Sequence, residues 1–463
     1  MAGLLNSVAS QYLFVGIWLL IPIIIEVVPT LYVYIRLSLG IFWNWIINLI
    51  NKNKTINNNN DFYLPEIDVV IPVYNSADTL EACILSVINS TYPIDKIKIT
   101  LVNNKSTDDS FKKFQEIQSK YNHAMISWLD AAQGKSKALN MAMYNTHNKY
   151  FIHVDSDGQL EENALLNMVK QFERDIDTVA LTGIILTQKE LIKQQKSKFI
   201  KIMDLLEYHE YSSAFLVARN SEALSNNMFT MSGAFSGFRR SELSSTFMFS
   251  SETVGEDTHM TFQMRDKGQV RLAKDAIFYV EPIDSFDTLY RQRQRWQMGE
   301  MQVIHMFEKT GDISIWKFFT NFMVRKLMLD HTFVFPRLIW FFAPAVLVAK
   351  NFSGKTLIVI YLSMYFLYVF ISGLFFLLAQ IYLHKFQKEY KFFVRSGVVL
   401  LLMPIYKFIL SWVLLAALLN GTNHMQWRVR SIIDELSTTG NLLKNDAKRF
   451  AHMLKDMKNN LKN

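Results

Sequence analysis

The stretch Ile67-Asp68-Val69-Val70-Ile71-Pro72-Val73 decides the fold of this chain. It is a short apolar run followed by polar residues, which is typical of a strand buried on both faces of a parallel sheet. Ala77–Ile88 comes next, with apolar residues at helical spacing, and Ile97–Val102 is a second apolar run. Strand, helix and strand in this order predict a β-α-β unit.

The same alternation continues along the chain. The pattern predicts a helix over about 109–120, a strand over Met125–Leu129, a helix over 135–146 and a strand over Tyr150–Val154. Repeated β-α-β units predict an α/β domain with a mostly parallel sheet and right-handed crossovers. Ligands then bind in a crevice at the carboxyl ends of the strands.

Hydrophobic segments flank this domain. Half of the 463 residues are hydrophobic and 35 are Phe, more than a soluble domain needs. Tyr12–Ile25 carries no charge and apolar residues continue to about Ile50, whereas about 20 residues suffice to cross a bilayer. We expect one retained span followed by an interfacial helix over 37–50, or a hairpin that turns at Pro29-Thr30.

Three further apolar segments follow the domain: Phe333–Val348, Thr356–Tyr382 and Val394–Leu419. If all three crossed the membrane, the tail would lie outside the cell. The tail is rich in Lys and Arg, which favours the cytoplasm. We therefore expect Val394–Leu419, which contains Pro404 and Lys407, to be a re-entrant or split element.

These observations divide the chain into five parts. They are an N-terminal membrane segment (1–50), an Asn-rich linker (51–61), the α/β domain (62–312), an interfacial helix with C-terminal membrane helices (313–420) and a basic tail (421–463). The α/β domain is thus inserted between transmembrane helices, and the Lys and Arg residues at its edges place it in the cytoplasm.

The net charge of +8 comes from the Lys and Arg residues at the edges of the domain and in the tail. Since the sequence has no nucleic-acid-binding motif, we expect no nucleic-acid partner. The single cysteine, Cys83, excludes an intramolecular disulfide.

Two carboxylates follow the strand Tyr150–Val154. Asp155 and Asp157 lie two residues apart at the ligand-binding edge of the predicted sheet. Hard oxygen ligands in small number suit Mg²⁺ or Mn²⁺, whose other positions are filled by diphosphate oxygens and water. A solvated acidic turn is the alternative. The strand-end placement favours a divalent cation.

Glu256 and Asp257 follow Gly255 and precede a helical pattern over Thr258–Arg265. Negative charge stabilises a helix N-terminus by about 0.3–1 kcal/mol, which is one explanation of the pair. The other is catalytic, with Asp257 as the general base toward an acceptor hydroxyl.

Gln292-Arg293-Gln294-Arg295-Trp296 lies on a predicted helix, where Gln292, Arg295 and Trp296 share a face. Arg binds diphosphate oxygens and Trp stacks on a sugar, although both residues also anchor helices at a membrane interface. Gly134 and Lys135 open another predicted helix after a loop, a place suited to binding a diphosphate.

Taken together, these motifs resemble the inverting, nucleotide-sugar-dependent glycosyltransferases of family 2, which have the GT-A fold. The similarity is greatest to the membrane-embedded branch that includes poly-N-acetylglucosamine, hyaluronan and cellulose synthases. It runs from about Ile67 to Trp296 and is carried by Ile71–Asn75, Gly134–Asn140, Asp155–Asp157, Ser232–Phe235, Glu256-Asp257 and the Gln292, Arg295, Trp296 set.

The resemblance implies a role for each matching residue. Pro72, Tyr74, Asn75, Asn103 and Asn104 would bind the nucleotide, and Gly134 and Lys135 its diphosphate. Asp155 would bind nucleotide and metal, Asp157 would bind metal, and Asp257, with Glu256 beside it, would be the catalytic base. Gly233, Ala234 and Phe235 would shape the acceptor entrance, which Gln292, Arg295 and Trp296 would close.

The chain departs from the family pattern at the base-reading corner. The family has at least one Asp in a stretch like Asp-Asp-Gly-Ser, where this chain has Asn103-Asn104-Lys105-Ser106, and Ser76 replaces an acidic residue. An amide oxygen still accepts a hydrogen bond from uracil N3–H, but without the charge-assisted part. A UDP-sugar is the expected donor.

The leading hypothesis is a membrane-embedded transferase that builds a cell-surface polysaccharide in the bacterial plasma membrane. One alternative adds a single sugar to a lipid-linked acceptor. The other is a non-catalytic partner that binds a nucleotide sugar. An accessory membrane subunit is a further partner to consider.

Overall fold

The computed structural model describes residues 23–51, 63–307 and 354–421, together with Gly16, Leu19, Leu20 and Leu338. The linker 52–62, most of the predicted span Phe333–Val348 and the basic tail beyond Gly421 lie outside the described residues.

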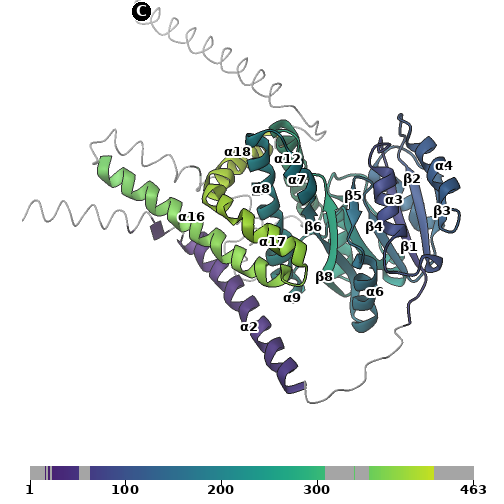
Figure 1. Ribbon diagram of the computed structural model, residues 1–463, viewed down its shortest axis with the longest axis horizontal. Coiled ribbons are helices and arrows are strands. Elements are labelled where there is room, and N and C mark those ends of the chain that lie inside the picture. Colours follow the sequence, from purple (N-terminus) through teal and green to yellow (C-terminus); the bar gives the residue numbers. More distant parts are fainter. Residues whose placement is uncertain are drawn as a thin grey trace, which may run out of the picture.

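The centre of the described domain is an eight-stranded sheet with the strand order β3-β2-β1-β4-β7-β6-β8-β5 (Figure 1). Its strands are β1 (Ile67–Val73), β2 (Ile97–Asn103), β3 (Met125–Asp130), β4 (Tyr150–Val154), β5 (Gly158–Leu160), β6 (Thr178–Thr187), β7 (Phe235–Arg239) and β8 (Gln269–Val280). The pairs β3–β2, β2–β1, β1–β4 and β6–β8 are parallel, while β7 and β5 pair antiparallel with their neighbours. This mixed, mostly parallel sheet confirms the predicted fold class.

The helices of this domain are α3 (Leu80–Ile88), α4 (Ser110–Lys120), α5 (Lys135–Asn145), α6 (Ala164–Arg174), α7 (Lys189–Gln194), α8 (Lys198–Tyr211), α9 (Arg219–Leu224), α10 (Arg240–Leu243), α11 (Glu256–Arg265) and α12 (Phe286–Phe307). A π-helical stretch, η3 (Ser212–Ala218), joins α8 to α9, and a 3₁₀ turn, η2 (Ile94–Lys96), precedes β2. α3 begins three residues later than predicted, because the carbonyl of Ser76 accepts the backbone N–H groups of Thr79 and Leu80 in a turn.

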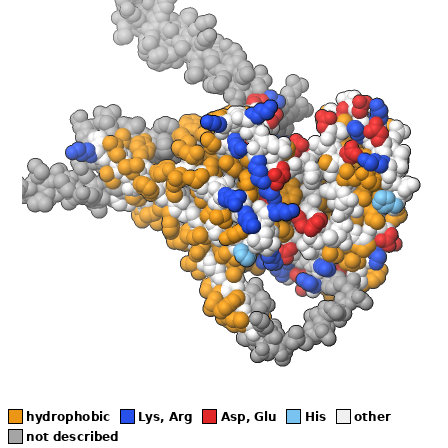
Figure 2. Space-filling model, in the orientation of Figure 1, with side chains coloured by type: hydrophobic (Ala, Val, Ile, Leu, Met, Phe, Trp, Pro, Cys, Tyr) orange, Lys and Arg blue, Asp and Glu red, His pale blue; other side chains and the backbone are white. Residues whose placement is uncertain are grey.

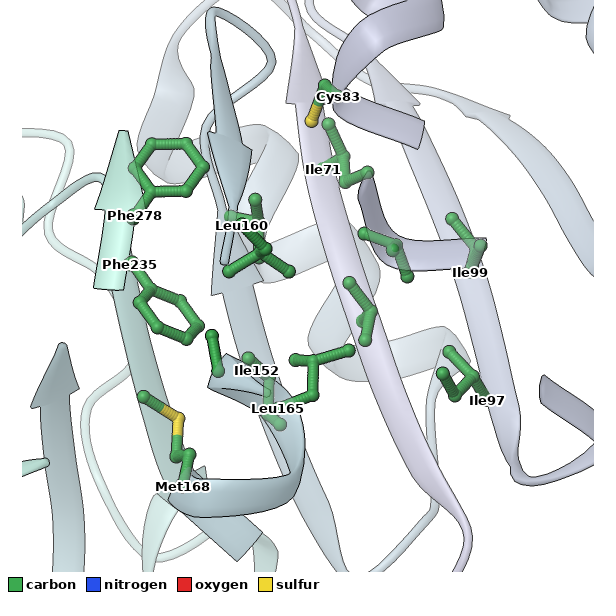
Figure 3. Packing of buried hydrophobic residues seen from close by; sticks show 14 of the residues in the cluster. Ile71, Cys83, Ile97, Ile99, Ile152, Leu160, Leu165, Met168, Phe235 and Phe278 are labelled. Carbon is green, nitrogen blue, oxygen red and sulfur yellow. The ribbon is translucent and has the colours of Figure 1, made fainter. Parts of the chain in front are cut away.

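Apolar side chains from the parallel strands form the core beneath the crevice. Figure 3 shows Ile71, Ile99 and Ile152 from neighbouring strands in one apolar cluster with Cys83 of α3 and with Leu165 and Met168 of α6. These side chains are fully buried, as the continuous apolar runs of the sequence predict for a sheet covered on both faces. The packing of this core therefore fixes the positions of the strands, and with them the strand ends from which the polar loops extend.

Outside the domain, the described residues form η1 (Ile23–Val27), α2 (Val28–Asn51), α16 (Gly354–Leu383), α17 (Gln387–Ser396), η5 (Gly397–Leu402) and α18 (Met403–Gly421). Among them, Val28–Ile47, Leu357–Leu383 and Gln387–Ala417 are long and apolar enough to cross a membrane. Figure 2 shows the apolar surface that α2 and α16 contribute.

Two details bear on the predicted spans. Pro29 is the second residue of α2, so the chain does not turn there as the hairpin alternative required. Within Val394–Leu419, the 3₁₀ stretch η5 lies between α17 and α18, and Pro404 occupies the first turn of α18, where a missing N–H costs nothing. That this segment is a re-entrant or split membrane element stays a prediction.

A buried ionic cluster attaches α17 to the soluble domain. The carboxylate of Glu389 in α17 pairs with Lys189 of α7 and accepts hydrogen bonds from the hydroxyls of Tyr208 and Tyr279, both at 3.2 Å. The Glu389 side chain is only 3% exposed. A buried charge of this kind requires its partners, so the cluster fixes α17 against the domain.

We expect Glu389→Ala to destabilise the protein by about 3 kcal/mol, because Lys189 loses its counter-charge in a largely buried position. The thermal midpoint of the full-length protein in detergent should fall by roughly 5–10 °C. Glu190→Ala is the matched control, since Glu190 forms an exposed pair with Lys193 and its loss should cost about 0.5 kcal/mol or less. Equal midpoints for the two variants would contradict the structural role of the cluster.

Candidate active site

The loops after β1 and β2 are tied together at the carboxyl edge of the sheet. Asn75 has a positive φ of 49°, a conformation that Asn adopts more readily than most residues. Its side-chain oxygen accepts the backbone N–H of Thr107 at 2.8 Å, and its own N–H donates to the Ser106 hydroxyl at 3.1 Å. Tyr74 is half-exposed beside this turn, while Pro72 is buried within β1. Tyr74 and Asn75 are therefore exposed at the carboxyl edge of the sheet.

The two asparagines of the base-reading corner are engaged within the loops. The side-chain oxygen of Asn103 accepts the N–H of Ser106 at 2.9 Å, and that of Asn104 accepts the N–H of Gly134. The amide nitrogen of Asn103 donates to the carboxylate of Asp130 at 2.7 Å. Asp130 is exposed at the end of β3, in register with Asn103. The structure thus adds to this corner a carboxylate that the sequence analysis missed, although it directly follows a predicted strand.

Lys135 joins three parts of the site. Its ammonium lies 2.5 Å from Asp155 Oδ1, donates to the carbonyl of Gly233 at 2.9 Å and lies 3.9 Å from Glu256 Oε1. Asp155 also contacts His153 Nε2 at 3.1 Å, and its N–H donates to the carbonyl of Ala234. The loop before β7 and the N-terminus of α11 are thereby brought to the end of β4.

The charges of these groups depend on one another. Burial opposes the charge of Lys135, yet the carboxylates of Asp155 and Glu256 raise its pKa. Burial also acts against ionised Asp155, but Lys135 and His153 hold the pKa of that carboxyl well below its usual range. Burial, assisted by the negative charge of Asp257, raises the pKa of Glu256 to about 7. Asp155 is therefore ionised at neutral pH, while Glu256 is near its titration point.

Asp157 follows the end of β4 and is exposed by its accessible surface. Partial desolvation by neighbouring residues, followed by the negative charge of Asp155, raises the pKa of Asp157 to about 6. Two carboxylates that repel one another in this way are stabilised by a divalent cation. The part of the chain that the structure describes has no cluster of three or more metal-ligating side chains. Mg²⁺ and Mn²⁺ fit such a site, because Mg²⁺ commonly takes one or two protein carboxylates and completes its shell with substrate phosphates and water.

Asp257 lies against the loop that precedes β7. A methyl group on Gly233 would come within 2.9 Å of Asp257 Oδ2, so the loop approaches this carboxylate more closely than other residues allow. Asp257 Oδ1 accepts the N–H of Thr258 at 2.7 Å at the start of α11. Asp257, Glu256, His153 and Gly233 line one small cavity, and Phe235 is buried at the start of β7. Asp257 is thus both a helix-terminal residue and a carboxylate at the site.

α12 crosses α11 at two glycines. A Cβ on Gly255 would lie 2.8 Å from the carbonyl carbon of Gly299, and a Cβ on Gly299 would lie 2.8 Å from Gly255 Cα. This contact brings the predicted Gln292, Arg295 and Trp296 face to the site. The positive charge of Arg295 acts on both Glu256 and Lys135. The backbone-to-backbone crossing therefore sets how far α12 lies from the carboxylates.

A cavity of about 430 Å³ extends beside α12 toward the membrane helices. Trp296, Tyr211 and Phe215 supply aromatic surface to it, and Leu410 and Leu414 of α18 border its other side. Gln292 accepts a hydrogen bond from the Tyr211 hydroxyl at 3.4 Å. The cavity connects the predicted acceptor residues with the membrane-facing part of the protein.

Arg293 lies one helical turn before Trp296 on α12 and was not among the predicted site residues. Its guanidinium lies 4.4 Å from the centre of the Trp296 ring and pairs with Glu210 at 2.5 Å. Tyr406 of α18 donates its hydroxyl to the same Glu210 at 3.1 Å. Arg293 therefore holds Trp296 and links α12 to a candidate membrane helix. The sequence could have pointed to Arg293, because it lies in the same short motif as Arg295, Gln292-Arg293-Gln294-Arg295-Trp296.

The mixed, mostly parallel sheet with acidic residues at its strand ends has the GT-A-like architecture. The model of the family described as "Glycosyl transferase family 2" matches residues 68–247. These residues are therefore similar to a glycosyl transferase family 2 domain.

Relatives and a solved structure agree with this assignment. The chain is 23% identical over 239 residues to the poly-beta-1,6-N-acetyl-D-glucosamine synthase of Staphylococcus epidermidis, covering 51% of this chain and 55% of that protein. It is 24% identical over 256 residues to the synthase of the same name from Staphylococcus aureus strain MSSA476, covering 55% and 58% respectively. The matches thus span little more than half the length of these relatives.

Among solved structures, a mannosyltransferase from Pyrobaculum calidifontis, in complex with GDP-Man and Mn²⁺, superposes with a TM-score of 0.53 at 15% identity. The match covers 85% of this chain and 98% of that one. At this level of identity the likeness shows the fold.

We expect Gly299→Ala to lower transferase activity about tenfold or more, because the added methyl would push α12 away from Gly255 and displace Arg295 and Trp296 from the carboxylates. Initial rates at saturating donor would measure this. Gly373→Ala in α16 is the matched control, since nothing lies within 4 Å of its added methyl. Wild-type rates in Gly299→Ala would show that the crossing distance is unimportant.

Proposed function

We propose that this protein transfers a sugar, with inversion, from a nucleotide-diphosphate sugar to a growing cell-surface polysaccharide at the membrane. One observation supports this most strongly. The ammonium of Lys135 pairs with Asp155 at the end of β4 and with Glu256 at the start of α11, and the charge of Arg295 in α12 acts on both Lys135 and Glu256. A binding protein without turnover would have no need for the paired acids Glu256 and Asp257, which line one small cavity with Gly233.

In the proposed reaction, Asp257 accepts the proton of the acceptor hydroxyl. The acceptor oxygen forms a bond to the anomeric carbon as the bond from that carbon to the diphosphate oxygen breaks on the opposite face. The product has the inverted configuration, and the nucleoside diphosphate leaves. Lys135 and Arg295 supply positive charge near the leaving diphosphate.

A divalent cation bound by Asp155 and Asp157 would neutralise negative charge on the leaving diphosphate. The Pyrobaculum mannosyltransferase, which shares the fold, was solved with Mn²⁺ and a nucleotide sugar. The repulsion between Asp155 and Asp157 supports a cation at the same strand end here.

Two observations support a polysaccharide product. The Staphylococcus relatives are named as synthases of a polymer. In this chain the cavity beside Trp296 is bordered by α18, so it offers space for an acceptor between Trp296 and a candidate membrane helix. We place the α/β domain on the cytoplasmic side, where nucleotide sugars are made.

We expect Asp257→Asn to lower the rate of sugar transfer by at least 100-fold while donor binding is retained, because the amide cannot accept the proton. The assay incubates full-length protein with Mn²⁺ or Mg²⁺ and a panel of radiolabelled nucleotide sugars, and then sizes the product. Asp177→Asn, an exposed Asp far from the site, is the matched control.

Product size separates the alternatives. A polymer supports the proposal, whereas a single sugar on a lipid acceptor retains the transferase and excludes the polymerase. Donor binding without turnover for any nucleotide sugar would overturn the catalytic proposal itself.

For the donor we propose a UDP-sugar, with Asp130 as the carboxylate of the base-reading corner in place of the missing family Asp. We expect Asp130→Asn to raise the KM for the donor about three- to tenfold with little change in kcat, because a charge-assisted hydrogen bond becomes a neutral one. Competition by free UDP and GDP measures nucleotide preference in both proteins. If Asp130→Asn binds UDP as the wild type does, the base is read elsewhere, and the proposed transfer reaction is unaffected.

A further inference from the structure

The basic stretch around Lys193–Lys201 has no part in the transfer reaction, and the fold places it next to α17. Lys193 of α7 lies 5.5 Å from the centre of the Phe392 ring of α17. One turn earlier on α7, Lys189 forms the buried pair with Glu389. Two segments that are about 200 residues apart in sequence therefore form one surface.

This surface, which we call the basic face, consists of exposed cations from both segments. They are Lys193, Lys196, Lys198, Lys388, Lys391 and Arg395. On α17 the three cations recur at helical spacing along the exposed side, while Glu389, Phe393 and Ser396 occupy the buried side. The acids beside the face are Glu190, which pairs with Lys193 at 3.0 Å, and Glu389, which is buried with Lys189. The face is therefore strongly positive.

Large apolar side chains are exposed among these cations. Val398 is 75% exposed, Phe199 69% and Leu401 51%. Leu206 on the buried side of α8 packs against Val399 and Met403, so α8 and η5 are neighbours. A surface evolved only for solvation does not combine cations with exposed Phe, Val and Leu. The combination is typical of segments that lie in the headgroup region of a bilayer.

The position of the basic face fits the same environment. α17 and η5 stand between the apolar helices α16 and α18, and α17 contacts the soluble domain. Figure 2 shows the Lys and Arg side chains over α7 and α17 next to the apolar surface of α16. This border is where a membrane surface meets the domain if α16 and the apolar part of Gln387–Ala417 that follows α17 cross the bilayer.

We propose that the basic face binds anionic phospholipid headgroups, with Phe199, Val398 and Leu401 entering the boundary of the acyl chains. Juxtamembrane cations gain affinity for an anionic surface with each added Lys or Arg. The face thereby fixes the height and tilt of the catalytic domain above the membrane. This inference is independent of the donor and of the reaction.

The test uses full-length protein in detergent and measures energy transfer from its Trp residues to pyrene-labelled phosphatidylglycerol or pyrene-labelled phosphatidylcholine. We expect wild type to prefer the anionic lipid. The variant Lys388→Gln, Lys391→Gln, Arg395→Gln should bind phosphatidylglycerol about fivefold or more weakly, with phosphatidylcholine binding unchanged. High salt should lower the affinity of the wild type for phosphatidylglycerol toward that of the variant, because salt screens the charges.

The matched control neutralises three lysines of α4, Lys112, Lys113 and Lys120, which lies at the far end of the domain (Figure 1). It removes the same net charge, and both variants keep the basic tail. The proposal is overturned if the α17 variant binds phosphatidylglycerol like the wild type, or if the α4 variant loses as much affinity. It is also overturned if the wild type prefers a soluble acidic polypeptide such as polyglutamate to the anionic lipid, because the face would then be a protein-binding surface.

Discussion

The ammonium of Lys135, placed between the carboxylates of Asp155 and Glu256 and the carbonyl of Gly233, is the interaction on which the candidate site depends. Each of these groups comes from a different part of the domain: the start of α5, the end of β4, the start of α11 and the loop before β7. A buried carboxylate is stable as an ion only if a positive charge lies beside it. The lysine therefore determines both the ionisation of Asp155 and the position of the elements that bring the acids together.

The same physical rule operates where the domain meets the membrane helices. Glu389 is buried against Lys189 and two tyrosine hydroxyls, and Glu210 is shared by Arg293 and Tyr406. Polar contacts of this kind define orientation more narrowly than apolar contacts do, because their hydrogen bonds are directional. Arg293 also covers Trp296, so the contacts that attach α18 to the domain also orient a residue that lines the cavity beside α12. Through α12, the contacts that position α18 against the domain therefore also affect where Trp296 lies in the candidate site.

Much of the fold was predictable, because buried parallel strands require continuous apolar runs and the helices between them require a repeating apolar stripe. The strands β1 to β4 begin where those runs begin, and α5 starts at the predicted Lys135. β7 was harder to predict, since Phe235–Arg239 contains two polar residues and a glycine and pairs antiparallel with two neighbours. Its strand character comes from the neighbouring strands and from Met168, which occupies the space beside Gly237.

The sequence by itself determined the class of fold, the order of the acidic motifs and the presence of apolar helices around the domain, because periodicity and residue type are local properties. It also indicated that the base-reading corner differs from the family pattern. Only the tertiary structure placed Asp130 beside Asn103, Arg293 over Trp296 and Gly255 against Gly299. Those contacts join residues far apart in the chain, and their distances follow from how helices and loops pack on the finished sheet. No spacing along the sequence encodes that packing.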